Sequence, residues 1–147
     1  MEERGALILA LPKGRVYEDM LPYLEGSDFE LIDDPKKTRK LVLDTKNQQV
    51  KILLVRGWDV PAYVTSGAAH LGVVGKDILI EKESEEFIEL RDLGTGKCRL
   101  SLAGKKDLLL GSTRMKIATK YPKSSIRFME SIGIQSEIIY LHGAQAV

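Results

Sequence analysis

The fold is decided by one stretch, residues 56–77, which reads RGWDVPAYVTSGAAHLGVVGKD. Asp59 can cap a short helix, because a proline follows it in the first turn and a glycine stands at the end. His70–Val74 is a short run that predicts a buried strand. Gly75 then permits a tight turn into a second helix that starts near Lys76. This order of helix, strand, turn and helix is typical of an α/β fold.

The residues on either side continue the alternation of strands and helices. Before the stretch, we predict a buried strand at 6–11, a helix that starts at Lys13-Gly14-Arg15 and ends by Gly26, and a hairpin of strands at 40–43 and 50–55. After it, we predict an acidic loop at 81–86, strands at 87–93, 98–103 and 116–119, a helix from Pro122 to Gly133, and a strand at 134–141. Such a pattern indicates an α/β fold with mixed, largely parallel sheets.

The composition is that of a globular protein with nearly balanced charge. The 147 residues are 44% hydrophobic and 29% charged, and the formal net charge is +1. So small a charge gives no overall attraction to nucleic acid or to an anionic membrane. The single cysteine excludes an internal disulfide, and the apolar run after residues 1–4 is too short for a signal peptide or membrane span. We therefore expect a cytoplasmic protein.

A change of composition near residues 92–96 indicates a hinge. We predict a first α/β lobe at 1–93 and a second at 94–147.

Two groups of residues have the chemistry of an anion site. Lys13-Gly14-Arg15 stands at a junction of strand and helix, where a helix N-terminus attracts anions and arginine binds phosphate oxygens in pairs. Gly72, Gly75, Lys76 and Asp77 form the second group, because glycines let backbone N–H groups approach a ligand. Taken alone, the second group is better explained as a tight turn with exposed Lys76 and Asp77.

Five segments together resemble the motifs of the ATP phosphoribosyltransferase family. The stretch at 56–77 resembles the family signature, and residues 10–15 and 38–41 resemble its two other N-terminal motifs. Residues 96–100 and 117–122 match later motifs, in the family's order. The resemblance covers nearly the whole chain.

The resemblance implies a reaction in which the phosphoribosyl group of phosphoribosyl pyrophosphate is transferred to N1 of ATP and pyrophosphate is released, the first step of histidine biosynthesis. Displacement at an anomeric carbon by a ring nitrogen needs positioning and neutralisation of the leaving group more than it needs a strong base. The resemblance makes Arg15 and Arg39 the catalytic residues, facing the pyrophosphate.

Further residues match motif positions that the resemblance assigns to substrate binding. They are Lys13, Gly14, Arg56, Asp59, His70, Gly72, Gly75, Lys76, Asp77, Lys97, Cys98 and Thr119. Arg56 and Asp59 are interpreted equally well as a rim of the nucleotide cleft or as an exposed arginine beside a helix cap. The family usually has aspartate where this chain has His70, which changes the local charge and the hydrogen bonding to a nucleotide.

The resemblance also implies a two-lobed architecture like that of the periplasmic binding proteins, with ligands in the cleft and an incomplete second lobe. The segment that starts at Leu141-His142-Gly143 departs from the family before its sugar-phosphate loop. The short form of the family is oligomeric and works with a regulatory subunit resembling histidyl-tRNA synthetase. Mg²⁺ is expected only with the substrate phosphates, since the histidines and the cysteine lack metal-ligand spacing. The alternatives are a catalytically impaired nucleotide-binding module and an assembly subunit whose activity is completed in trans.

Overall fold

The computed structural model describes residues 5–111 and 113–141. Residues up to Lys97 and residues from Cys98 onward form two compact units. The domain boundary that we predict between residues 93 and 94 remains a prediction. The predicted family-like segment after Leu141 lies outside the described residues. Among the residues described, none of the helices has both the length and the apolar character needed to cross a membrane.

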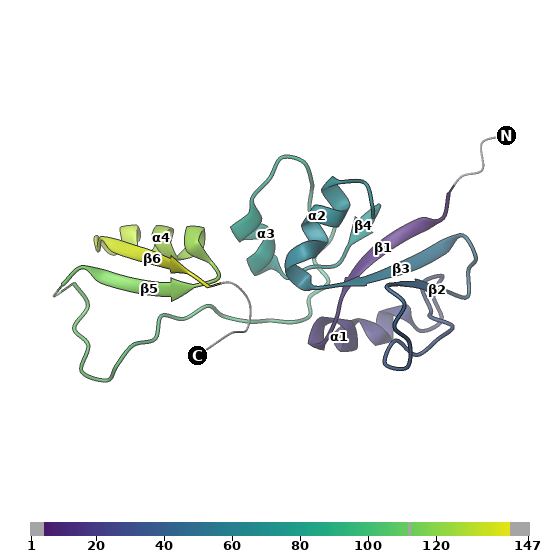
Figure 1. Ribbon diagram of the computed structural model, residues 1–147, viewed down its shortest axis with the longest axis horizontal. Helices are drawn as coiled ribbons and strands as arrows, with labels where there is room; N and C mark the ends of the chain where they lie inside the picture. Colours follow the sequence, from purple (N-terminus) through teal and green to yellow (C-terminus); the bar gives the residue numbers. More distant parts are fainter. Residues whose placement is uncertain (1–4, 112, 142–147) are drawn as a thin grey trace. The chain divides into compact units, whose positions relative to one another are not determined.

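A four-stranded sheet forms the centre of the first unit, in the order β2-β3-β1-β4 (Figure 1). Its strands are β1 (Leu7–Pro12), β2 (Val42–Asp44), β3 (Val50–Val55) and β4 (Leu71–Gly72). β1 is parallel to both β3 and β4, and β2 is antiparallel to β3. The apolar runs of β1 and β3 are continuous because these central strands are covered on both faces. The predicted hairpin and the mixed, largely parallel sheet are confirmed.

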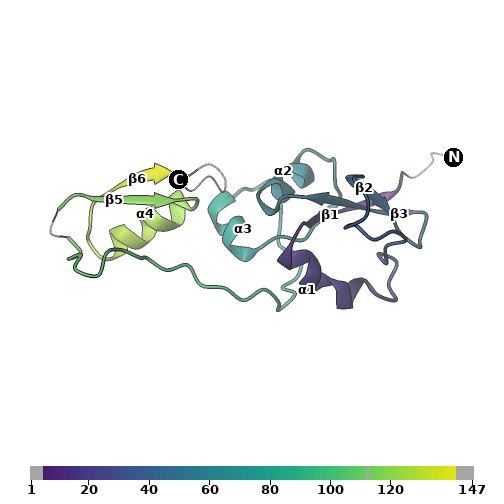
Figure 2. The same cartoon turned by 60° about the horizontal axis from the view of Figure 1, so that its bottom comes forward.

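Helices cover both faces of this sheet. On one face, α1 (Arg15–Leu24) packs its apolar side chains against Ile52 and Leu54 of β3. On the other face, α2 (Val60–Thr65) packs against Leu53 and Val55, the alternate residues of the same strand. Figure 2 shows α1 and α2 on opposite sides of β1 and β3. A 3₁₀ turn, η1 (Gly57–Asp59), connects β3 to α2, and α3 (Lys76–Lys82) follows β4.

The second unit has a parallel two-stranded sheet and one helix. β5 (Met115–Thr119) leads to α4 (Pro122–Ser131), and β6 (Ser136–Tyr140) then pairs with β5. The core of this unit consists of Met115, Ile117 and Met129. Pro122 stands in the first turn of α4, where its missing N–H has no cost. These elements confirm the order of strand, helix and strand predicted for this part of the chain.

The two strands predicted at 87–93 and 98–103 are wrong. Neither segment has regular structure, although apolar residues alternate in both. Ile88 and Leu90 are 78% and 69% exposed, and Leu100 is 55% exposed. A strand needs a neighbour to take its backbone hydrogen bonds. Within the described part of the chain, neither segment pairs with another strand, so the alternation alone does not make a strand.

Three smaller predictions also need correction. The acidic stretch at 81–86 is not all loop, because α3 continues to Lys82 and Glu81 is buried, with 6% exposure. The predicted strand at His70–Val74 shortens to the two residues of β4, which are not buried. Asp59 stands at the N-cap position of α2 but makes no side-chain cap hydrogen bond, because its carboxylate binds Arg56 instead.

Candidate functional site

The carboxyl ends of β1 and β3 lie side by side, and each leads into a predicted substrate-binding residue. Pro12 pairs with Val55 in the parallel register. The Lys13 amide continues this pairing by donating a hydrogen bond to the Val55 carbonyl at 2.9 Å. Lys13 and Arg56 therefore follow the ends of two neighbouring strands. Open α/β sheets bind their ligands at this end of the strands.

Gly14 turns the chain from β1 into α1. Its φ of 84° lies in the left-handed region, which only glycine adopts without strain. The Glu18 amide donates to the Gly14 carbonyl at 3.2 Å and closes the first turn of the helix. Lys13 and Arg15 are exposed on either side of Gly14. Among the described residues neither side chain has a hydrogen-bond or ion-pair partner. Both cations are thus available to an anion at the start of α1.

The antiparallel strand β2 brings Arg39 to the same edge of the sheet. Val42 pairs with Leu53, and the Leu54 amide donates to the Leu41 carbonyl at 2.9 Å. The residues before β2 therefore approach the end of β3. Arg39 stands two residues before Leu41 and is exposed. The sheet topology thus directs four cationic residues to one edge: Lys13, Arg15, Arg39 and Arg56.

Arg56 is held by the turn that follows it. The Asp59 amide donates to the Arg56 carbonyl at 2.9 Å, which folds η1 back over the arginine. The Arg56 Nε atom donates to Asp59 Oδ2 at 2.8 Å. The two terminal nitrogens of the guanidinium remain for another acceptor. Asp59 therefore orients an exposed Arg56 at this edge, and the place of both residues at the rim of a nucleotide cleft stays a prediction.

α3 packs beside the same turn. A methyl group added at Gly57 would lie 3.4 Å from the Ile78 side chain, and Lys82 Nζ lies 5.8 Å from the centre of the Trp58 ring. Lys76, the first residue of α3, forms an ion pair with Glu89. The Asp77 carboxylate folds back over Gly75, whose φ of −64° is ordinary for any residue. The predicted tight turn therefore does not depend on left-handed backbone at Gly75.

Gly72 has a packing role. A Cβ atom at this position would lie 2.6 Å from Val60 Cγ1 and 3.0 Å from Val64 Cγ2. Those distances are far below van der Waals contact, so glycine lets β4 lie directly against α2.

His70 extends the pairing of β1 and β4 at the other end of the sheet. Its amide donates to the Ile8 carbonyl at 2.9 Å, and its Nδ1 accepts a hydrogen bond from the Ile8 amide at 3.1 Å. Nδ1 must be unprotonated to accept, so the ring proton is on Nε2. Ile8 and Lys13 are five positions apart, which is about 16 Å along a strand. The structure does not bring His70 to the cationic edge.

Lys97, Cys98 and Thr119 are not joined to this edge by any described contact. Lys97 ends the first unit and Cys98 begins the second, and both are exposed. Thr119 ends β5, and its Oγ1 accepts hydrogen bonds from the Tyr121 amide at 3.0 Å and the Ser125 hydroxyl at 3.4 Å. Thr119 therefore fixes the entry into α4, and its role in a site stays a prediction.

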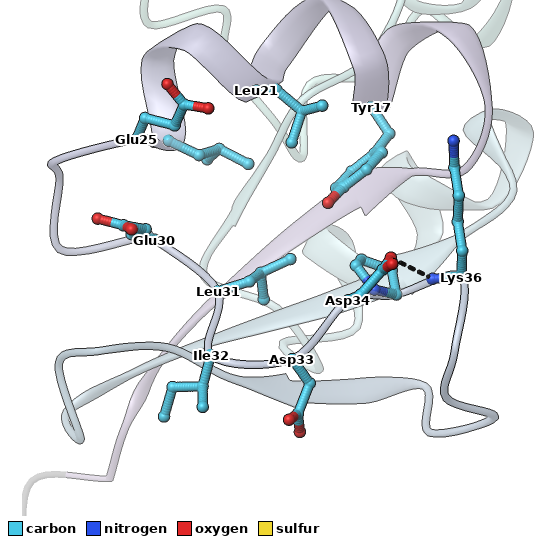
Figure 3. A pocket seen from close by; sticks show the side chains of 11 residues that line it. Tyr17, Leu21, Glu25, Glu30, Leu31, Ile32, Asp33, Asp34 and Lys36 are labelled. Carbon is cyan, nitrogen blue, oxygen red and sulfur yellow. Dashed lines mark hydrogen bonds between the residues drawn. The ribbon is translucent and has the colours of Figure 1, made fainter.

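A groove of about 390 Å³ lies elsewhere, between α1 and residues 30–36 (Figure 3). Burial and the nearby charge of Asp34 raise the pKa of Tyr17, which points into it. The hydrogen bond from Lys46, together with that from the Gly26 amide, lowers the pKa of Glu30 on the rim. None of the predicted site residues lines this groove, and its acidic lining does not suit a phosphate. We therefore assign the candidate site to the sheet edge.

Sequence reasoning missed one feature of this edge, the pairing of Lys76 with Glu89. The two residues are 13 positions apart with a loop between them, so no periodicity connects them. No cluster of three or more metal-binding side chains occurs among the residues that the structure describes.

The chain was compared with known proteins. A family model described as HisG, ATP phosphoribosyltransferase, matches residues 56–146. The chain belongs to the ATP phosphoribosyltransferase family. The family member from Hydrogenovibrio crunogenus is 43% identical over 96% of this chain and 68% of its own length. The member from Psychrobacter arcticus is 44% identical over 97% of this chain and 62% of its own length.

A solved structure of the family has the same fold. It is the ATP phosphoribosyl transferase (HisG:HisZ) complex from Thermotoga maritima, which is 33% identical, with a TM-score of 0.74. The match covers 94% of this chain and 65% of that chain. This likeness confirms the family and the fold class predicted from the sequence. The chain spans about two thirds of the length of the relatives it matches.

Proposed function

We propose that this chain transfers the phosphoribosyl group of phosphoribosyl pyrophosphate to N1 of ATP and releases pyrophosphate. One observation supports the proposal most directly. Three separate segments, which carry Lys13 and Arg15, Arg39, and Arg56, converge on the carboxyl edge of one sheet. The relatives, named ATP phosphoribosyltransferase, supply the identity of the reaction.

The cationic edge suits the demands of this reaction. The bond from the anomeric carbon to the pyrophosphate oxygen breaks as N1 of ATP attacks, and negative charge develops on the leaving pyrophosphate. Arginine stays protonated throughout and binds two phosphate oxygens at once. In our proposal Arg15 and Arg39 contact the pyrophosphate during bond cleavage, while Lys13 and Gly14 hold it at the start of α1. No side chain has to act as a strong base.

The nucleotide is proposed to lie beside α3 and η1. Arg56, oriented by Asp59, and Lys76 would contact its phosphates, and Gly75 and Asp77 would line the approach. Lys97, Cys98 and Thr119 complete the proposed contacts from the segments that follow. His70 and Gly72 support β4 and act on the site through it.

The remaining parts of the proposal concern ions, partners and location. Mg²⁺ would enter with the substrate phosphates and reduce the repulsion between them. The HisG:HisZ complex from Thermotoga maritima supports an oligomeric assembly with a regulatory subunit resembling histidyl-tRNA synthetase. The balanced charge and the single cysteine support a cytoplasmic location.

The test is an assay of pyrophosphate release from ATP plus phosphoribosyl pyrophosphate, with and without the regulatory subunit. Wild type should release pyrophosphate, and Arg15→Gln should release it at least about thirtyfold more slowly, since one lost contact to developing charge costs about 2–4 kcal/mol. Lys51→Gln is the matched control, because Lys51 lies at the opposite end of β3, where it forms an ion pair with Asp44 at 3.2 Å. No release by wild type in either condition, or equal rates in all three proteins, would refute the proposal.

A further inference from the structure

We propose that Glu89 competes with the anionic ligand for Lys76, and that ligand binding thereby frees residues 87–91 from α3. The inference rests on the proposed function in one respect, since it takes Lys76 to contact a phosphate. It adds a residue, Glu89, that affects how tightly the cationic edge binds an anion. It also connects anion binding at that edge to the release of the chain that leads out of the first unit.

The ion pair joins the cationic edge to the departing chain. Lys76 begins α3, whose packing against Gly57 and Trp58 puts it beside the turn that carries Arg56. Glu89 lies in a segment without regular structure. Its carboxylate binds the Lys76 ammonium, with the two side chains 39% and 64% exposed. Water and dissolved anions therefore reach the pair from outside, so a ligand can replace the carboxylate without any rearrangement of the core.

The segment has few other attachments near Glu89. Ile88 and Leu90, on either side, are 78% and 69% exposed. Four residues later, Leu93 packs against the apolar cluster under α1, and its carbonyl accepts a hydrogen bond from the Tyr23 hydroxyl at 3.3 Å. Leu93 therefore holds the later part of the segment, while Glu89 holds the earlier part to α3.

The competition follows from charge. An ammonium donates to one set of acceptors at a time, and a polyphosphate carries more negative charge than a carboxylate. Once a phosphate binds Lys76, a carboxylate close by repels it, so the bound state favours Glu89 turned away. Each event thus opposes the other: the ion pair weakens ligand binding, and the ligand releases residues 87–91.

The experiment measures the binding of inorganic pyrophosphate to the whole chain by titration calorimetry. Glu89→Gln keeps the shape of the side chain and removes its charge. We expect roughly two- to fivefold tighter binding, which corresponds to losing competition from an exposed ion pair. Asp44→Asn is the matched control, because it removes the same charge from an exposed pair with Lys51 at the opposite edge of the sheet. It should bind pyrophosphate as wild type does.

Two further measurements separate competition from a general charge effect. In a Lys76→Gln background, Glu89→Gln should give no gain in affinity. In ¹⁵N-labelled wild type, pyrophosphate should lower the heteronuclear NOE of residues 88–90, and Glu89→Gln should show the low values without ligand. Unchanged or weaker binding by Glu89→Gln, an equal gain in Asp44→Asn, a gain that persists without Lys76, or unchanged NOE values would each overturn the inference. No binding by wild type would instead refute the anion site, and the inference with it.

Discussion

Replacing Gly72 by alanine should destabilise the first unit by about 1–3 kcal/mol, the usual cost of overpacking a well-packed contact. The added Cβ would lie 2.6 Å from Val60 Cγ1, and Val60 is 1% exposed, so its side chain has no free space to enter. The added Cβ would also lie 3.0 Å from Val64 Cγ2, so it cannot move away from Val60 toward Val64. Because β4 has only two residues, part of the strain will be relieved by a shift of the strand, which keeps the cost below that of a central position.

Urea denaturation followed by the fluorescence of Trp58, the single tryptophan, reports on this unit directly. Gly5→Ala is the matched control, because its Cβ would meet nothing within 4 Å, and its stability should stay within about 0.5 kcal/mol of wild type. In Gly72→Ala/Val60→Ala the shorter of the two contacts is removed and only the 3.0 Å contact to Val64 Cγ2 remains, so the double variant should be more stable than the sum of the two single effects by about 0.5–3 kcal/mol. Additive effects, or a Gly72→Ala variant as stable as Gly5→Ala, would refute the packing role.

Three further predictions follow from the same structure. Arg39→Gln should raise the activation barrier for pyrophosphate formation by about 2–4 kcal/mol. Its urea midpoint should stay unchanged, since Arg39 is exposed. Single-turnover rates equal to those of wild type would show that Arg39 is not a catalytic residue. Hydrogen bonds from Lys46 and, to a smaller extent, from the Gly26 amide lower the pKa of Glu30 in the folded protein. The ionised Glu30 therefore stabilises the fold fully above its unfolded pKa, and this stabilisation is lost as the pH falls from about 4.5. Urea midpoints measured between pH 7 and pH 3 should decline less in Glu30→Gln than in wild type. Phe128 on α4 is 50% exposed and Ile132, one turn later at the C-cap of the helix, is 43% exposed, so wild type should self-associate in sedimentation experiments and Phe128→Glu should be shifted toward monomer.

The elements that the sequence predicted correctly are those whose signals are local. The continuous apolar run of β1 and β3, the hairpin between 43 and 50, and the proline and glycine that bound α4 each depend on neighbours in the chain. The strands predicted at 87–93 and 98–103 failed for the opposite reason. Their apolar alternation is real, but a strand is made by its partner, and sequence spacing does not say whether a partner is present.

The site could be predicted as a set of residues, but not as an arrangement. Motif resemblance named Arg39 and Lys13 without showing that an antiparallel strand brings them to one edge. It also gave Gly72 a ligand role, which stays a prediction, and it did not show that the closeness of Val60 makes this glycine necessary for packing. The pairing of Glu89 with Lys76 depends on where a loop returns, and no local signal in the sequence carries that information.

The most direct test of the central claim is a map of where phosphate binds. Amide chemical shifts of the ¹⁵N-labelled chain would be followed during titration with pyrophosphate. The account predicts that the largest changes cluster at residues 13–16, 39–40, 56–57 and 75–77, the segments at the carboxyl edge of the first sheet. Residues 44–51 at the opposite edge and residues 30–36 at the acidic groove should stay nearly unchanged. Changes centred on either of those two regions, or saturable changes absent from residues 13–16, would contradict the account.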